Sequence, residues 1–284
     1  MPQNGEKPHQ MIIVRTLQEL AGARATLGDV GFVPTMGALH AGHLTLVAAA
    51  KQAGLTPVAS IFVNPTQFGP KEDLSRYPRD EAGDIAKLEA AGCALVWLPS
   101  VEEMYPSGCA TTIHVSGPSQ HWEGMQRPGH FNGVATVVAK LFGQIRPQAA
   151  FFGEKDWQQI QVVRRMVEDL HLPVKIVPVA TVREADGLAL SSRNTYLSLA
   201  ERMTAPKLHA ALSHAVQYLL AGKEPATTLH NVRLELATAG MVPDYVALVH
   251  AETLEPIATL QPPARLIAAA KLGHVRLLDN LPVG

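Results

Sequence analysis

The chain lacks the features that mark several classes of protein. It has two cysteines, Cys93 and Cys109, whereas a disulfide framework needs more of them in a shorter chain. Cys93 stands in an apolar run, so we expect a buried free thiol there. No segment approaches the roughly 20 apolar residues that cross a bilayer, and the segment 1–10 lacks the apolar core of a signal peptide. We therefore expect a cytoplasmic protein without a membrane partner.

An excess of one charge sign is also missing. There are 24 basic and 25 acidic residues, which give a formal net charge of -1, and the basic residues are scattered. This balance argues against nucleic acid as the main partner but leaves room for a local phosphate site. With 47% hydrophobic and 17% charged residues, the chain has ample material for a core. Its length predicts one large domain and a small one.

The first two-thirds of the chain alternate between strand-like and helical patterns. Strands are expected at 11–14, 30–33 (stopped by Pro34), 57–63, 94–98, 149–152 and 174–179, with one more candidate at 111–115. Helices are expected after a capping box formed by Thr16 and Glu19, and at 43–53, 80–91, 132–145 and 157–170. Such alternation predicts βαβ units and a mainly parallel, doubly wound sheet.

The pattern changes after about Asp186. Two helical stretches, 199–220 and 226–239, precede strand-like runs at 245–250, 266–270 and 275–278. Helices followed by strands without alternation predict a small α+β domain. We place the domains at 1–185 and 186–284. In the larger domain, ligands should bind beyond the carboxyl ends of the parallel strands.

One loop at such a strand end contains two histidines. From Thr35 to His43 it reads T-M-G-A-L-H-A-G-H. Gly37 and Gly42 permit close backbone approach, and the helix N-terminus that follows suits phosphate through unpaired N–H groups and its dipole. His40 and His43 can then lie on one side of the first turn and donate to a phosphate. A chance pair, or half of a metal site, is the alternative.

A second loop, F-V-N-P-T-Q-F-G from Phe62 to Gly69, also follows a predicted strand. The amides of Asn64 and Gln67 can donate and accept, which suits a substrate that carries hydroxyl and carboxylate groups. Taken alone, a proline–asparagine turn without function is the better interpretation.

Two more polar segments are suited to phosphate. In G-E-K-D-W-Q-Q from Gly153 to Gln159, Lys155 offers a point charge and Asp156 can accept from ribose hydroxyls. A solvated charge cluster is the alternative, but it explains poorly a cation at a helix N-terminus, where the dipole disfavours it. In L-S-S-R-N from Leu190 to Asn194, two hydroxyls and a guanidinium suit a triphosphate, and a polar hinge is the alternative.

Together with R-P-G-H-F-N-G-V-A-T-V-V from Arg127 to Val138, these segments in this order resemble the pantoate–β-alanine ligases of the H-x-G-H nucleotidyltransferase superfamily. The resemblance covers nearly the whole chain after about Met11. It implies a Rossmann-like ATP-binding domain, a smaller lid-like C-terminal domain and a homodimer. The implied reaction joins (R)-pantoate and β-alanine through pantoyl adenylate and releases AMP and pyrophosphate. We expect Mg²⁺ to be carried by the ATP phosphates, without dedicated protein ligands.

The resemblance also implies roles for single residues. His43 matches the catalytic acid, and His40, Lys155 and Arg193 are expected to stabilise charge during the transfer. The residues implied for ATP are Met36, Gly37, Ala38, Leu39, His40, Ala41, Gly42, His43, Gly153, Glu154, Lys155, Asp156, Val182, Leu190, Ser191, Ser192 and Arg193.

The acid substrate is expected to lie between two glutamines. Gln67 and Gln159 match the family's pantoate contacts, and Gln67 also lies beside β-alanine. From the helix pattern and the family together, we expect Val134, Val137 and Val138 to pack against the geminal methyl groups of pantoate.

Two departures and two alternatives remain. The family usually has methionine where this chain has Leu190, an apolar exchange that preserves the role, and the segment 121–126 does not match the family, so we expect a surface loop there. A simpler nucleotidyltransferase is disfavoured by the two glutamines and by the lack of a second basic subsite. A non-catalytic nucleotide-binding module is disfavoured by the intact histidines and Lys155.

Overall fold

The structure is a computed structural model that describes residues 10–284, so the expectation for the segment 1–10 lies almost wholly outside it. A six-stranded sheet with only parallel pairings forms the larger part of the molecule, in the order β1-β4-β3-β2-β5-β6. The strands are β1 (Ile12–Val14), β2 (Val30–Thr35), β3 (Thr56–Ile61), β4 (Leu95–Trp97), β5 (Ala149–Gly153) and β6 (Lys175–Val179).

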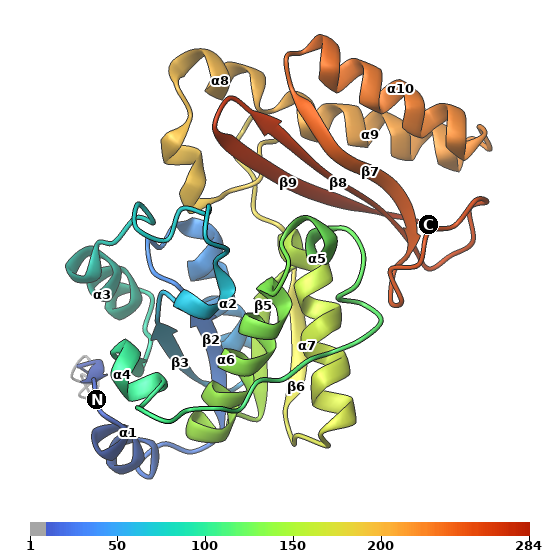
Figure 1. Cartoon of the computed structure of the whole chain (residues 1–284). Coiled ribbons are helices and arrows are strands. Elements are labelled where there is room, and N and C mark those ends of the chain that lie inside the picture. The colour runs from blue at the N-terminus through green and yellow to red at the C-terminus, as the bar shows by residue number, and fades with distance from the viewer. Residues whose placement is uncertain (1–9) are drawn as a thin grey trace, which may run out of the picture.

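Helices cover both faces of this sheet (Figure 1). They are α1 (Leu17–Arg24), α2 (Ala41–Gln52), α3 (Glu81–Ala90), α4 (Val101–Met104), α5 (Glu123–Gln126), α6 (His130–Ile145) and α7 (Trp157–Asp169). Successive strand residues point to opposite faces. Phe32 therefore joins the core beneath α1, α6 and α7, whereas Val33 joins the core beneath α2 and α3.

The order of the strands reverses between β2 and β5. From β2 the chain continues through β3 to β4 on one side, and β5 and β6 lie on the other. A crevice opens at such a switch point, beyond the carboxyl ends of the two strands. Because β2 ends at Thr35 and β5 ends at Gly153, the fold directs two of the predicted loops into this crevice.

The smaller C-terminal part packs helices against an antiparallel sheet of order β7-β8-β9. Its elements are α8 (Leu199–Thr204), α9 (Lys207–Leu220), α10 (Pro225–Thr238), β7 (Val242–His250), β8 (Ala264–Leu272) and β9 (Val275–Val283). Figure 1 shows this domain at one end of the larger sheet. The predicted fold class, a doubly wound parallel sheet with a smaller α+β domain, is confirmed. The boundary at 185/186 stays a prediction.

Two local predictions are confirmed, the capping box and the buried thiol. Thr16 and Glu19 form the capping box, with Glu19 N–H donating to the Thr16 hydroxyl at 3.2 Å and Thr16 N–H donating to the Glu19 carboxylate at 3.1 Å. Cys93 is a buried free thiol, and burial raises its pKa to about 11. Within residues 10–284, no helix is both long and apolar enough to cross a membrane.

The expectation that Pro34 stops its strand is wrong, because β2 continues to Thr35. The carbonyl oxygens of Asp29 and Thr35 accept hydrogen bonds from the β3 side, so Pro34 faces β5. On that side the paired register ends at Phe32. The missing N–H of proline therefore costs the sheet no hydrogen bond.

Three further expectations need correction. The segment 111–115 is a loop, and its Ile113 N–H donates to the Thr136 hydroxyl of α6 at 2.9 Å instead of to a strand. The single helix expected at 199–220 is two helices, because Pro206 lacks the N–H that would continue α8. The helix expected from residue 43 begins at Ala41, which makes His40 its N-cap residue.

Candidate active site

A cavity of about 240 Å³ lies at the switch point. Most of the predicted site residues line it: Met36, His40, Gly42, His43, Gln67, Gly153, Lys155, Asp156, Gln159, Val182, Leu190, Ser191, Ser192 and Arg193. The structure therefore brings the four predicted segments together. Gly37, Ala38, Leu39, Ala41 and Glu154 are not among the residues that line this cavity.

The backbone of the histidine loop is held from behind by α3. The Leu39 N–H donates to Asp84 at 2.7 Å, and the Lys87 ammonium donates to the Leu39 carbonyl at 2.9 Å. The preceding turn passes through the left-handed region, with φ of 84° at Gly37 and 50° at Ala38. A β-carbon is disfavoured there, so the conformation of Ala38 must be stabilised by its surroundings. Ser192 supplies part of this support by donating to the Ala38 carbonyl at 3.0 Å.

His40 and His43 lie against each other at the start of α2, with ring centroids 4.1 Å apart. The His40 N–H donates to Nδ1 of His43 at 3.2 Å. Nδ1 of His43 is thus an acceptor, and in the neutral ring the proton must sit on Nε2. Gly42 makes room for this pair, because a β-carbon there would lie 3.0 Å from the His40 ring.

Both rings are neutral at ordinary pH. Burial, and then the charge of Lys155, lowers the pKa of His40 to about 4. Burial, with smaller contributions from His40 and Lys155, lowers the pKa of His43 to about 3. In the free protein the two histidines can therefore donate hydrogen bonds, but they do not carry charge.

A network of amides fixes the second predicted loop, where Asn64 precedes the short helix η1 (Pro65–Gln67). The Asn64 amide donates to the side-chain oxygen of Gln67 at 3.1 Å and to the Gly133 carbonyl at 3.2 Å. The Asn64 oxygen accepts from the Tyr105 hydroxyl at 2.9 Å. Gln67 is consequently held with its NH₂ group toward Met36, 3.1 Å from the sulfur.

The rest of this end of the cavity is apolar. Val134, Val137 and Val138 of α6 line it. On α7, the two consecutive glutamines differ: Gln159 lines the cavity, whereas Gln158 is buried and donates to the carbonyls of the segment before α5. The cavity thus presents an apolar wall beside two amide side chains.

Lys155 and Asp156 belong to the short helix η2 (Glu154–Asp156) at the end of β5. The Lys155 ammonium lies 3.7 Å from the Asp156 carboxylate, and both residues line the cavity. Glu154 points elsewhere, with its carboxylate 3.2 Å from Arg265 of β8. Its side chain is therefore not presented to this cavity.

Arg193 lies in the fourth segment, in the helix η3 (Ser192–Tyr196). Its guanidinium makes a two-point contact with Asp73, with both distances 2.9 Å. Asp73 therefore occupies two of the guanidinium nitrogens that were predicted to bind phosphate. Burial alone would lower the pKa of Arg193, but the contact with Asp73 raises it. Ser191 accepts from the Arg193 N–H at 3.3 Å, which shapes the start of η3.

Arg127 and His130 line the same cavity, although neither was predicted as a site residue from the sequence. Arg127 pairs with Glu72 at 2.7 Å, and its guanidinium lies 3.0 Å from Nε2 of His130. Nδ1 of His130 lies 2.9 Å from the Gln67 carbonyl and must donate to it. Burial, and then Arg127, lowers the pKa of His130 to about 4. The R-P-G-H motif that contains both residues could have identified them from the sequence.

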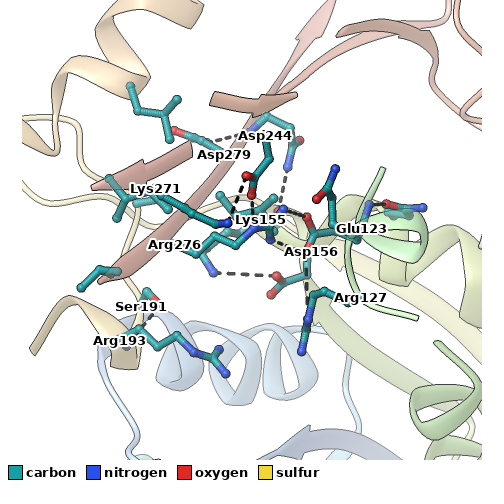
Figure 2. A pocket seen from close by; sticks show the side chains of 18 of the residues that line it. Glu123, Arg127, Lys155, Asp156, Ser191, Arg193, Asp244, Lys271, Arg276 and Asp279 are labelled. Carbon is teal, nitrogen blue, oxygen red and sulfur yellow. Dashed lines mark hydrogen bonds and ion pairs between the residues drawn. The ribbon is translucent and has the colours of Figure 1, made fainter. Parts of the chain in front are cut away.

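A second cavity, of about 560 Å³, lies between the two domains and shares Arg127, His130, Lys155 and Asp156 with the first. Figure 2 shows Glu123 and Arg127 of the larger domain facing Asp244, Lys271 and Arg276 of the smaller one. The segment 121–126 was expected to be a surface loop, and this is wrong for its middle. Glu123 is buried, and it contacts Arg276 at 2.6 Å and the Tyr245 hydroxyl at 2.9 Å.

Known proteins match both this architecture and the sequence. The family model for pantoate-beta-alanine ligase matches residues 11–282. The chain belongs to the pantoate–β-alanine ligase family. It is 56% identical to the pantothenate synthetase of Acidiphilium cryptum, with 96% of this chain and 100% of that protein aligned. It is also 56% identical to that of Rhizorhabdus wittichii over 96% and 99% of the two chains.

Solved members of the ligase family have the same fold. The crystal structure of pantothenate synthetase from Thermus thermophilus is 52% identical, has a TM-score of 0.92 and aligns with 96% of this chain and 99% of its own. A ligase from Francisella tularensis, solved as a complex with beta-gamma ATP and beta-alanine, is 32% identical, with a TM-score of 0.82 and 96% and 97% coverage.

Proposed function

We propose that the cavity between β2 and β5 binds ATP and pantoate side by side. As a member of its family, the protein is an ATP-dependent carbon–nitrogen ligase that joins pantoate to β-alanine. The main support for this proposal is that five predicted site residues line one cavity: His40, His43, Lys155, Gln67 and Gln159. Donors for phosphate and amides for an acid substrate thus face the same space.

The first step forms an acyl adenylate. A pantoate carboxylate oxygen attacks the α-phosphorus of ATP, a new P–O bond forms, and the bond to the β-phosphate oxygen breaks as pyrophosphate leaves. Gln67 and Gln159 hold the attacking carboxylate, and the Nε2–H of His43 donates to the phosphate that develops charge. Lys155 provides a cation there, and Asp73 leaves Nη1 of Arg193 for the same task.

The second step forms the amide. The free amine of β-alanine attacks the acyl carbon, the bond to the AMP oxygen breaks, and AMP leaves while the nitrogen loses a proton to solvent. The larger cavity between the domains opens onto the same Lys155 and Asp156, and we assign the approach of β-alanine to it. The valines of α6 are assigned to the geminal methyl groups of pantoate, because they form the apolar wall beside Gln67.

Magnesium, the homodimer and the cytoplasmic location stay proposals. Among residues 10–284 there is no group of three histidine, cysteine or acidic side chains that could hold a metal ion. We propose that Mg²⁺ enters the site bound to the ATP phosphates. The smaller domain, placed beyond the cavity, is proposed to close over the substrates.

The test is release of AMP with each substrate omitted in turn. We expect AMP only when ATP, pantoate and β-alanine are all present, and exchange of pyrophosphate into ATP when pantoate is present without β-alanine. Exchange without pantoate would instead indicate a simpler nucleotidyltransferase. ATP binding without exchange or AMP release would indicate a non-catalytic nucleotide-binding module.

A further inference from the structure

Asn280 of β9 contacts the loop that carries Lys155. Its side-chain amide donates to the backbone carbonyl of Glu154 at 2.9 Å and to that of Lys155 at 2.8 Å. Asn280 is 5% exposed, so water does not compete for these bonds. A residue of the smaller domain thus holds two consecutive peptide groups of the larger domain.

The orientation of this amide is fixed by its other end. The Asn280 oxygen accepts a hydrogen bond from Arg265. Arg265 in turn pairs with Glu154 at 3.2 Å, and its guanidinium lies 3.5 Å from the centroid of the Trp157 ring. An inverted amide would place its NH₂ group against a cation and its oxygen against two carbonyls. The NH₂ group must therefore face Glu154 and Lys155.

The neighbouring residue, Asp279, is connected through Arg183 to the other polar segment of the site. Asp279, on the opposite face of β9, accepts from Arg183 at 2.7 and 2.8 Å. Arg183 pairs as an isolated bridge with Ala189, directly before Leu190. One dipeptide of the smaller domain therefore contacts the Lys155 loop directly and is connected to the segment 190–194 through Arg183. Figure 2 shows Asp279 and Lys155 among the residues that line the cavity between the domains.

We propose that Asn280 is a positioning residue for the reaction and holds the Glu154–Lys155 backbone where the Lys155 ammonium meets the triphosphate. The proposal rests on the proposed role of Lys155 in binding phosphate. Lys155 precedes α7, and the dipole of that helix disfavours a cation at its N-terminus. The ammonium of Lys155 lies 3.7 Å from the carboxylate of Asp156. The side chain itself thus has little to fix it in the free protein, and its backbone anchor determines where the charge lies.

The test measures nucleotide affinity by calorimetry in the full-length protein. Asn280→Asp keeps the size of the side chain but turns a carboxylate oxygen toward the two carbonyls. We expect the Kd of the α,β-methylene analogue of ATP, which cannot release pyrophosphate, to rise about tenfold, the effect of losing a hydrogen bond that orients a charged group. The Kd of adenosine, which lacks phosphate, should change little. Asn280→Ala removes the donors without repulsion and should weaken the analogue less, which provides a second variant if the first folds poorly.

A double-mutant cycle with Lys155→Met decides whether Asn280 acts through Lys155. If it does, Asn280→Asp has no further effect on the analogue in the Lys155→Met background. Additive losses, or an equal loss of adenosine affinity, would overturn the proposal. If Lys155→Met alone leaves the analogue affinity unchanged, the role of Lys155 in the proposed function fails, and the inference fails with it.

Trp122→Phe is the matched control for domain docking. It removes the hydrogen bond from Trp122 to the Leu254 carbonyl (2.9 Å), which also joins the two domains but does not contact the Lys155 loop. We expect analogue affinity close to that of the unaltered protein. A loss as large as that of Asn280→Asp would show a general docking effect and contradict the positioning role.

Discussion

At the scale of single residues, the cavity is set up to donate hydrogen bonds without charged histidines. The backbone N–H of His40 fixes the neutral tautomer of His43, so its Nε2–H points away from the bond that holds it. Such a preorganised donor is most valuable where charge develops during the transfer. The sequence predicted the two histidines but not their protonation, because that depends on burial and on the nearby Lys155.

We expect His43→Ala to lower turnover by roughly 10²–10³, the effect of losing one preorganised donor. Steady-state AMP formation at saturating substrate measures it. His214→Ala, which alters an exposed histidine of α9, is the control and should retain full turnover. Near-normal turnover of His43→Ala would remove His43 from the catalytic residues.

The buried histidines also predict how stability depends on pH. The pKa values of His43, His40 and His130 fall from 6.5 to about 3, 4 and 4 in the folded protein. Below pH 6.5 the unfolded chain therefore binds more protons than the folded one, and the free energy of unfolding decreases as the pH falls from about 6.5 to 4.

Urea unfolding across this pH range measures the effect. His130→Gln should show a shallower dependence, because one of the three groups is removed and glutamine can still donate to the Gln67 carbonyl. If the free energy of unfolding of this variant depends on pH as steeply as that of the unaltered protein, His130 does not contribute to the pH dependence.

At the scale of elements, the packing of α6 against η1 places the pantoate end of the cavity. Gly133 makes the close approach possible: a β-carbon there would lie 2.4 Å from the Thr66 carbonyl oxygen and 2.6 Å from the Gln67 nitrogen. Both are backbone atoms, so the helix and the loop would have to separate.

Gly133→Ala should therefore raise the KM for pantoate at least about tenfold by displacing Gln67, roughly the loss of one hydrogen bond to a charged group. The helix content should change much less. Gly143→Ala in the same helix is the matched control, because a β-carbon there meets nothing within 4 Å. It should leave KM unchanged and stabilise the helix by up to about 1 kcal/mol. Equal KM values for pantoate in the two variants would contradict the proposal that Gln67 binds pantoate.

At the scale of the whole molecule, buried polar contacts join the two domains. Glu123 of α5 binds Arg276 of β9, and Arg276 also contacts Asp244 of β7 at 2.6 Å. The Arg276 side chain is 24% exposed and keeps Asp244 as a partner if Glu123 is lost. The penalty for breaking the pair is therefore below that for an isolated buried pair.

We expect Glu123→Ala to lower the free energy of unfolding by about 1–3 kcal/mol, as for other unsatisfied buried groups. Urea unfolding followed by tryptophan fluorescence measures it, because Trp122 lies beside the pair and 5.6 Å from the Tyr245 ring. Met125→Ala, on the exposed side of the same short helix, should be close to neutral. Unchanged stability of Glu123→Ala would show that other contacts dock the smaller domain.

The sequence by itself determined the alternation of strands and helices, the class of fold and the segments that meet in the cavity. Hydrophobic periodicity reports which positions are buried, and parallel strands bring their carboxyl ends to one edge. Thr35–His43 and Gly153–Gln159 could thus be placed together from the residues alone. The strand end predicted at Pro34 was wrong, because the effect of a missing N–H depends on which neighbouring strand the residue faces.

Only the tertiary structure decided how the charged groups are partnered. Asp73 binds Arg193 across 120 residues of sequence, Glu123 binds Arg276 across 153, and Asn280 reaches the Lys155 carbonyl across 125. Periodicity carries no information about such pairs, because a polar residue looks the same in sequence whether water or a distant side chain satisfies it. The path of the chain determines that, and it places the smaller domain against the loop that carries Lys155.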